Sequence, residues 1–224
     1  MNTHIEQAVK NNIIWCGIVS ESHGIPYYCN GGVWGLLSEA PPLCPDIITA
    51  GMDVTDQEVA DFIGDRNIST IKDSFANLDM ASIGFKVLFN AVWIYHPPVS
   101  VSESAKLGWR VITKKEDLTK WTYAHDSEKV IKYNLLDRDD VKIFIKEKED
   151  EISGFIANLG AGVIGISNAF SMEYTNEALW KDIVQAVSTE FQNLPIVGYE
   201  QGNSLKAALS CGWESLGPLR IWIR

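Results

Sequence analysis

Two polar positions beside apolar runs are the residues of this chain best suited to chemistry. Glu200 directly follows LPIVGY (194–199), which predicts a buried strand, and Ser167 with Asn168 interrupts the apolar run GVIGIS. Ligands of open α/β sheets collect at the carboxyl ends of strands, where a carboxylate can take a proton from an ammonium group directly or through water. Glu200 is therefore a candidate general base, although a solvated loop Glu is the simpler interpretation.

Three further side chains are weighed with Glu200. A Ser-Asn pair in an apolar run indicates either the lining of a cleft or a structural hydrogen bond, and the sequence leaves both open for Ser167 and Asn168. His23 stands in ESHGIP, a Gly/Pro turn, and an imidazole titrates close to neutral pH. His23 is therefore a second candidate catalytic base, or else an ordinary loop histidine.

The cysteines indicate neither disulfides nor a metal site. Cys16, Cys29, Cys44 and Cys211 are irregularly spaced and lack the close C-x2-4-C pairs that zinc modules use. We expect buried free thiols and no metal. The chain also has no G-x-S-x-G elbow and no recognisable Ser/His/Asp set, so a covalent enzyme intermediate is not expected.

Charge and hydropathy exclude several classes of partner. The net charge is −10 and the pI about 4.8, which argues against nucleic acid binding and is compatible with an amine substrate. The sequence holds no apolar run of about 18 residues, so no membrane span is expected. The first residues do not resemble a secretory signal, and we expect a cytoplasmic protein.

Local patterns predict an α/β (α+β) chain with a mixed, largely antiparallel sheet flanked by helices. Strands are expected at 13–20, across 27–37, and at 85–95, 141–149, 151–160, 161–170, 194–199, 213–217 and 218–224. Helices are expected at 55–66 and 71–82, from the Thr113/Glu116 capping box to Trp121, and at 176–191 and 204–210.

The stretch PPVSVSESAKLG (97–108) reads as a linker or hinge, which predicts an N-terminal α/β region at 1–96 and a second region at 109–224. Residues 76–95 and 206–223 both run from a helix through a Gly-aromatic pair into a strand with a late Trp. Two half-domains built alike would explain this echo, and so would chance.

From residue 141 onward the order of elements is similar to that of the GNAT N-acyltransferase superfamily. The matching residues are Asn203, the pair Ala207-Ala208, Gly212-Trp213 in place of the usual Gly-Phe, Glu214 and Gly217. The resemblance maps 161–170 onto the fourth strand, 176–191 onto the next helix and 194–199 onto the fifth strand. It implies a GNAT-like C-terminal half, and residues 1–80 have no role assigned by it.

The resemblance implies a transferase that moves an acyl group from acetyl-CoA or another acyl-CoA to a small-molecule amine. The fourth-strand residues Ser167, Asn168, Ala169 and Phe170, together with Asn203, would contact the donor. Two features depart from the superfamily. The segment 171–182 has no Gly or Arg where a pyrophosphate loop is expected and carries Glu173 and Glu177, and Ala208 occupies the usual place of a general-acid Tyr.

Two alternatives follow from these departures. The chain is either a catalytically degenerate GNAT-like binding module, or an acyltransferase whose donor is an acyl-carrier protein. Such a carrier is acidic and would need a local basic patch, to which Lys129, Lys132, Lys142 and Lys146 could contribute. A homodimer is also compatible with the sequence.

Overall fold

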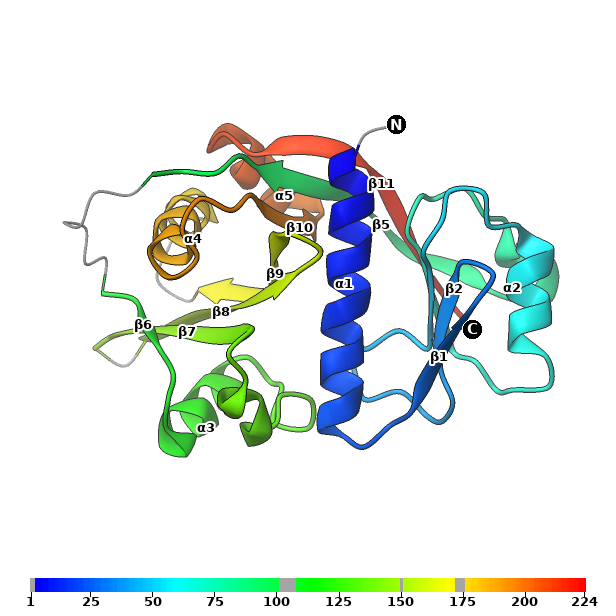
Figure 1. Cartoon of the computed structure of the whole chain (residues 1–224), viewed down its shortest axis with the longest axis horizontal. Helices are drawn as coiled ribbons and strands as arrows, with labels where there is room; N and C mark the ends of the chain where they lie inside the picture. Colours follow the sequence, from blue (N-terminus) through cyan, green and yellow to red (C-terminus); the bar gives the residue numbers. More distant parts are fainter. Residues whose placement is uncertain (1–2, 101–107, 150, 172–175) are drawn as a thin grey trace.

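The computed structural model describes residues 3–100, 108–149, 151–171 and 176–224, and these form one mixed sheet covered by helices on both faces (Figure 1). The strand order is β1-β2-β3-β4-β11-β5-β10-β9-β8-β7-β6. The strands are β1 Tyr27–Asn30, β2 Val33–Leu36, β3 Ile47–Thr49, β4 Thr70–Asp73, β5 Lys86–His96, β6 Arg110–Val111, β7 Val141–Lys148, β8 Glu151–Gly160, β9 Val163–Ser171, β10 Ile196–Glu200 and β11 Glu214–Ile223.

The helices lie in two layers, one on each face of the sheet. They are α1 Thr3–Ser22, α2 Asp56–Ile63, α3 Lys115–Ala124, α4 Asn176–Glu190 and α5 Gly202–Ser210, with the 3-10 helices η1 Met80–Ile83 and η2 Tyr133–Asp137. The apolar clusters of α1 and α3 lie on one face, and those of α2, α4 and α5 on the other. Only the pairs β3–β4 and β9–β10 are parallel among the described strands, so the predicted mixed, largely antiparallel sheet is confirmed.

The topology occurs twice along the chain. In the first copy β1, β2 and β3 form an antiparallel meander, α2 leads to β4 parallel to β3, and η1 leads to the long strand β5. In the second copy β7, β8 and β9 form the meander, α4 leads to β10 parallel to β9, and α5 leads to the long strand β11. Residues 76–95 and 206–223, which echo each other in sequence, lie at the same place in the two copies.

The two copies exchange their last strands. β5, from the first copy, pairs with β10 of the second, while β11 pairs with β4 of the first, and β5 and β11 pair with each other. Neither copy therefore completes its sheet from its own residues. The boundary between 1–96 and 109–224 stays a prediction, and residues 101–107 of the expected linker lie outside the described residues.

The prediction of a strand at 13–20 is wrong, because this segment is the second half of α1. Its run of Ile, Trp and Val residues resembles a strand locally, but residues 15–20 are buried without interruption, so no helical spacing marks them and tertiary packing decides the outcome. α1 runs across the middle of the sheet, and in the view of Figure 1 α4 is seen to its left and α2 to its right. Asn11 Nδ2 fixes it there by donating to the carbonyl oxygens of Asn158 at 3.1 Å, Gly160 at 3.1 Å and Val163 at 3.2 Å.

Three other local predictions are also wrong. Residues 71–82 are not a helix: β4 ends at Asp73, whose carboxylate accepts from the backbone N–H groups of Phe75, Asn77 and Leu78 and so holds a turn. The N-cap of α3 is Lys114, without a side-chain hydrogen bond, so the capping box at Thr113 does not form. β11 is one strand with a bulge between Ser215 and Gly217, where two strands were expected.

Several start and stop signals are confirmed. Thr55 and Glu58 form the reciprocal capping box of α2, and Gly84 ends η1 in a left-handed conformation with φ of 90°.

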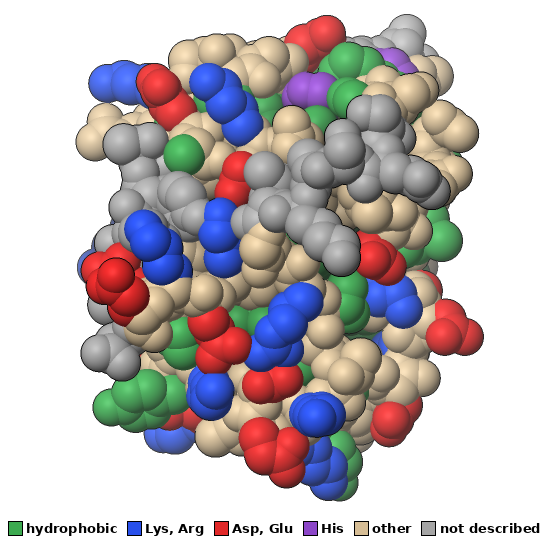
Figure 2. Space-filling model, turned by 90° about the vertical axis from the view of Figure 1, so that its left-hand side faces the viewer, with side chains coloured by type: hydrophobic (Ala, Val, Ile, Leu, Met, Phe, Trp, Pro, Cys, Tyr) green, Lys and Arg blue, Asp and Glu red, His purple; other side chains and the backbone are tan. Residues whose placement is uncertain are grey.

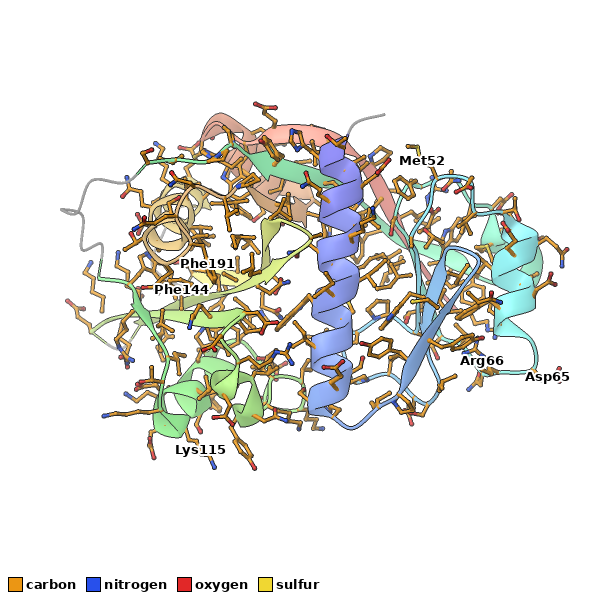
Figure 3. The ribbon with its side chains drawn as sticks, in the orientation of Figure 1. Met52, Asp65, Arg66, Lys115, Phe144 and Phe191 are labelled. Atoms are coloured by element: carbon orange, nitrogen blue, oxygen red, sulfur yellow. The ribbon has the colours of Figure 1, made fainter. Side chains whose placement is uncertain are left out.

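On the α4 side of the sheet, Phe144 of β7 stacks on Phe155 of β8 with ring centroids 4.4 Å apart. Phe144 and Phe191, which follows α4, belong to one apolar cluster (Figure 3). Trp180 is 2% exposed and lies within this core rather than at its edge.

Candidate functional site

The strands β9 and β10 pair only at their beginnings. Ile196 pairs with Ile164 and Val197 with Gly165, after which the two strands are no longer hydrogen-bonded to each other. β10 continues to Glu200 along β5, and β9 continues to Ser171 along β8. Because backbone groups must otherwise pair when buried, this opening leaves donors and acceptors available to a ligand.

A bulge in β9 lies at this opening. β8 pairs Gly154 with Phe170 and Ile156 with Ser167, so Asn168 and Ala169 together face a single residue of β8. Asn168 has φ of 54°, a left-handed conformation that Asn tolerates better than most residues. Bulges break the ladder and re-aim backbone groups, and this one turns the 168–169 segment out of its pairing with β8.

A cavity of about 490 Å³ lies beside the opening, within the range of small-molecule sites. It lies between α1 and the sheet, and both copies of the topology contribute to it. Its walls include Trp15 and Val19 of α1, Leu43 before β3, Lys72 of β4, Phe89 of β5, Ile131 after α3, Ser167, Asn168 and Ala169 of β9, and Tyr199 and Glu200 of β10.

Glu200 is the ionisable residue at the end of β10. Its side chain is half-buried, and it forms no ion pair with any residue that the structure describes. Burial raises the pKa of its carboxyl group from 4.5 to about 7, against the opposing effect of a hydrogen bond from the Gln201 backbone. A carboxylate with a pKa of this size exchanges protons near neutral pH, as a general base must.

Lys72 supplies the other charge of the cavity. It is 3% exposed, and its Nζ donates to Asn12 Oδ1 at 2.9 Å and to Tyr199 Oη at 3.4 Å. Burial opposes its charge, but the effects of Tyr199 and of the thiols of Cys16 and Cys44 outweigh burial, and the pKa of Lys72 is raised. The two oxygen acceptors and the face of the Tyr199 ring, 4.5 Å from Nζ, favour the ammonium form of Lys72.

The thiols beside Lys72 are not nucleophiles at neutral pH. Burial raises the pKa of Cys16, and it raises the pKa of Cys44 to about 12. A nucleophilic cysteine needs its thiolate, which burial disfavours here. All four cysteines are free thiols, but of these only Cys16 is buried: Cys44 and Cys211 are half-buried and Cys29 is exposed, so the expectation of buried thiols is wrong for Cys29. The described residues hold no group of three His, Cys, Asp or Glu side chains arranged as metal ligands.

The other residues predicted for the site lie in different places. Ser167 Oγ is buried at the cavity without a hydrogen-bond partner, so the structural hydrogen bond that the sequence left open is not formed by this side chain. His23 is absent from the cavity wall: its Nε2 lies 2.7 Å from the carbonyl oxygen of Val130, a contact that ties the end of α1 to the loop after α3. Phe170 packs against Trp121 and His125 instead.

Asn203, which was expected to contact the donor, is exposed in the first turn of α5. The segment 171–182, where a pyrophosphate loop was expected, is described in part. Glu173 lies outside the described residues, whereas Glu177 is exposed in the first turn of α4 and accepts from Ser210 Oγ at 3.3 Å. A carboxylate in a first turn complements the helix dipole itself and disfavours a second anion there.

Basic side chains on the face that carries β6, β7 and α3 are interspersed with acidic ones (Figure 2). Lys146 forms an ion pair with Asp182 at 3.3 Å, and Arg110 forms one with Glu147 at 2.6 Å. The lysines proposed for a carrier-protein patch thus include one that is already paired with a neighbouring carboxylate.

Comparison with known proteins identifies the fold. The chain resembles a functionally unknown conserved protein from Staphylococcus epidermidis, with a TM-score of 0.61, 10% identity, and coverage of 89% of this chain and 94% of that one. It also resembles a putative GNAT-family acetyltransferase from Novosphingobium aromaticivorans, with a TM-score of 0.57, 9% identity, and coverage of 94% and 96%. The chain has a GNAT-like fold. No protein-family model and no curated protein sequence matches it.

The likeness extends over nearly the whole chain rather than the C-terminal half alone. The GNAT-like fold expected for residues 141–224 is confirmed, and the limit to that part of the chain is not. No helix among the described residues combines the length and apolar character that a membrane crossing requires.

Proposed function

We propose that this chain transfers an acyl group from an acyl-CoA thioester to an amine, with Glu200 as the general base. The observation that carries the proposal is the position and ionisation of Glu200. Its carboxyl group has a pKa of about 7 and lies at the open end of β10, on the wall of the cavity that continues the gap between β9 and β10.

Acyl transfer to an amine requires a base for the acceptor, a proton for the departing thiol and stabilisation of the carbonyl oxygen. Glu200 accepts the proton that the ammonium group of the acceptor must lose before its nitrogen can attack. A C–N bond to the thioester carbonyl then forms and the nitrogen loses a second proton; the C–S bond breaks, and the thiolate takes up that proton and leaves as the free thiol. Backbone groups at the bulge of Asn168 and Ala169, freed from β8, are available to hold the carbonyl oxygen as it gains negative charge.

The fit of an acyl-CoA donor differs along its length. The unpaired edges of β9 and β10 suit the amide-rich pantetheine arm, which hydrogen-bonds as a strand does. The acidic first turn of α4, with Glu177, does not suit a pyrophosphate there. This observation favours a second donor, an acyl-carrier protein, whose pantetheine arm carries no free pyrophosphate and adenosine.

Calorimetric titration with acetyl-CoA and with CoA tests the donor directly. Binding with a dissociation constant near the micromolar range, about −8 kcal/mol, supports acyl-CoA. The absence of heat, with an unchanged melting temperature in millimolar ligand, excludes free CoA, and the titration is then repeated with an acylated carrier protein. A lack of binding to both donors would overturn the proposal.

Release of free thiol from the bound donor, measured over a panel of primary amines, tests the role of Glu200. Glu200→Gln keeps the size of the side chain and removes the base, and we expect its kcat/KM to fall by about a hundredfold or more. Glu214→Gln is the matched control, since Glu214 also lies at a strand end but is exposed and is not part of the cavity wall. Equal activity of the two variants would contradict the assignment.

A further inference from the structure

Lys72 is a buried cation that has no anionic partner among the residues the structure describes. No carboxylate of the described residues lies within 4.0 Å of its Nζ, and its contacts are the amide oxygen of Asn12, the hydroxyl of Tyr199 and the Tyr199 ring, whose centroid is 4.5 Å away. A buried charge without a counter-charge is costly, by several kcal/mol. Such a group persists in a cavity wall when a ligand supplies the opposite charge.

The carboxylates of the neighbouring strands are engaged elsewhere. Asp46 Oδ2 accepts from the backbone N–H groups of Ser69 and Thr70 and from Thr70 Oγ1. Asp73, next to Lys72 in β4, is fully buried and holds the turn after that strand. The thiols of Cys16 and Cys44 stay protonated at neutral pH, as argued above, and so do not neutralise Lys72 either.

The rest of the cavity wall is partly polar, with Asn12, Thr70, Ser167, Asn168, Tyr199 and Gln201, and its larger part is apolar. Trp15, Val19, Leu43, Phe89 and Ile131 line it, from α1, the loop before β3, β5 and the loop after α3. Among the described residues of the wall, Glu200 alone carries another charge, and it is not within ion-pair distance of Lys72. The cavity therefore combines one cation, one separate carboxylate and an apolar surface.

We propose that the acceptor is an amine that also carries a carboxylate and an apolar group, that is, an apolar amino acid. This inference rests on the proposed function and names the substrate class of the same site. Lys72 binds the carboxylate, Glu200 faces the amino group, and the apolar side chain packs against Trp15 and its neighbours. Lys72 is a positioning residue for this substrate, since it contacts a group that does not react.

A carboxylate fits the site better than a phosphate. A single ammonium group balances one negative charge, and the described cavity wall adds no Arg to share a second one. The protein carries a net charge of −10, which further opposes a dianion. With an amino acid the charges of ligand and cavity cancel, since its carboxylate meets Lys72 and its ammonium meets Glu200.

Three probes separate the features of this substrate: L-phenylalanine, L-phenylalaninamide and phenethylamine. All three carry the amine and the aromatic ring, and only the first carries a carboxylate. Calorimetric titration of the full chain is expected to show L-phenylalanine binding about a hundredfold more tightly than the other two, because they leave the ammonium of Lys72 unpaired. Equal binding of the three, or no binding of any, overturns the inference.

Two variants remove the free charge in different ways. Lys72→Met keeps most of the length of the side chain without its charge, and Asn12→Asp places a carboxylate where an amide oxygen now accepts from Lys72 Nζ at 2.9 Å. Both are expected to abolish the preference for L-phenylalanine while phenethylamine binds as before. Lys86→Met, on β5 away from the cavity wall, is the control and keeps the preference. A preference retained in both variants overturns the inference.

Binding and turnover distinguish this inference from the proposed function. If phenethylamine is acylated as efficiently as L-phenylalanine, the acyltransferase stands and the amino acid acceptor is wrong. If no amine is acylated with any donor but the binding pattern of the wild type and the two variants is as expected, the acyltransferase is wrong and the ligand class stands. The melting temperature of each variant confirms that it is folded.

Discussion

Lys72 Nζ lies over the face of the Tyr199 ring, 4.5 Å from its centroid, and donates to its hydroxyl at 3.4 Å. These residues are 127 positions apart in the sequence and belong to different copies of the repeated topology. Tyr199 immediately precedes Glu200. The contact therefore joins the cation of the first copy to the strand of the second copy that ends at Glu200, and both charged residues line one cavity. The exchange of β5 and β11 between the copies brings these strands into one sheet.

The two copies of the topology differ at the end of their parallel strand pair, β3–β4 in the first copy and β9–β10 in the second. In the first copy, the turn held by Asp73 follows β4, and the Ser74 backbone N–H donates to Thr49 Oγ1 at 2.9 Å. Trp93 Nε1 donates to the carbonyl oxygen of Ser74 at 2.7 Å. Side chains and this turn thus occupy the end of the β3–β4 pair, whereas the end of the β9–β10 pair opens on a cavity. We infer that the first copy supports the site and the second contains the base.

The pH dependence of activity is expected to follow Glu200. Its carboxyl group has a pKa of about 7, and only the ionised form accepts a proton from the acceptor. We expect kcat/KM to rise with pH up to an apparent pKa near that of Glu200 in the free protein. Initial rates between pH 5 and 9, corrected for ionisation of the amine with acceptors of different basicity, measure this. A profile that depends only on the acceptor's own pKa would contradict the role of Glu200.

Glu200 should also make the free energy of unfolding depend on pH. The pKa of Glu200 is 4.5 in the unfolded reference and about 7 in the fold, so the native state holds the extra proton between these values. The free energy of unfolding therefore decreases as pH rises through this window, by about 3 kcal/mol from this group. Glu200→Gln removes that contribution and should be more stable than the wild type at pH 8, with little difference at pH 4. Urea unfolding at both pH values checks it, with Glu214→Gln as the control.

Close packing of α1 against the sheet depends on Gly165 and Asn11. A Cβ at Gly165 would overlap the Asn11 side chain and would lie 2.7 Å from Asn158 Oδ1. We expect Gly165→Ala to lower the free energy of unfolding by about 2 kcal/mol. Asn11→Ala also destabilises, because three carbonyl oxygens lose their donor, but the double variant should lose less than the sum of the two. A double-mutant cycle by urea unfolding measures this coupling; strict additivity would show that the two residues do not clash.

Patterns within single elements predicted much of the C-terminal part. The alternation in VKIFIKEK predicted β7, and the apolar face of 176–191 predicted α4. Glu200 was found because a charged residue directly after a buried strand stands where ligands collect. The segment 13–20 was misassigned because its β-branched and aromatic residues fit either a strand or a buried helix, and only its packing against the sheet decides between them.

Tertiary relationships could not be predicted in this way. Lys72 occurs in an unremarkable stretch, STIKDS, and nothing local distinguishes it from an exposed lysine. Its burial depends on α1 and β10, which bring Asn12 and Tyr199 to it from 60 and 127 positions away. The exchange of β5 and β11 is likewise a pairing choice between distant strands, which the internal echo indicated only as a similarity of sequence.

Two substitutions at Asn168 distinguish the role of the backbone conformation at the bulge from that of the amide side chain. Gly adopts φ of 54° without strain, whereas a β-branched residue strongly resists it. We therefore expect Asn168→Gly to keep both the bulge and acyl transfer, and Asn168→Val to lose about 1–2 kcal/mol of stability and most of its kcat, because the strand would re-form its pairing with β8. Unfolding measurements and turnover with saturating acceptor test both variants. If Asn168→Gly loses turnover while it remains fully folded, the amide side chain takes part in the chemistry and the backbone does not act alone.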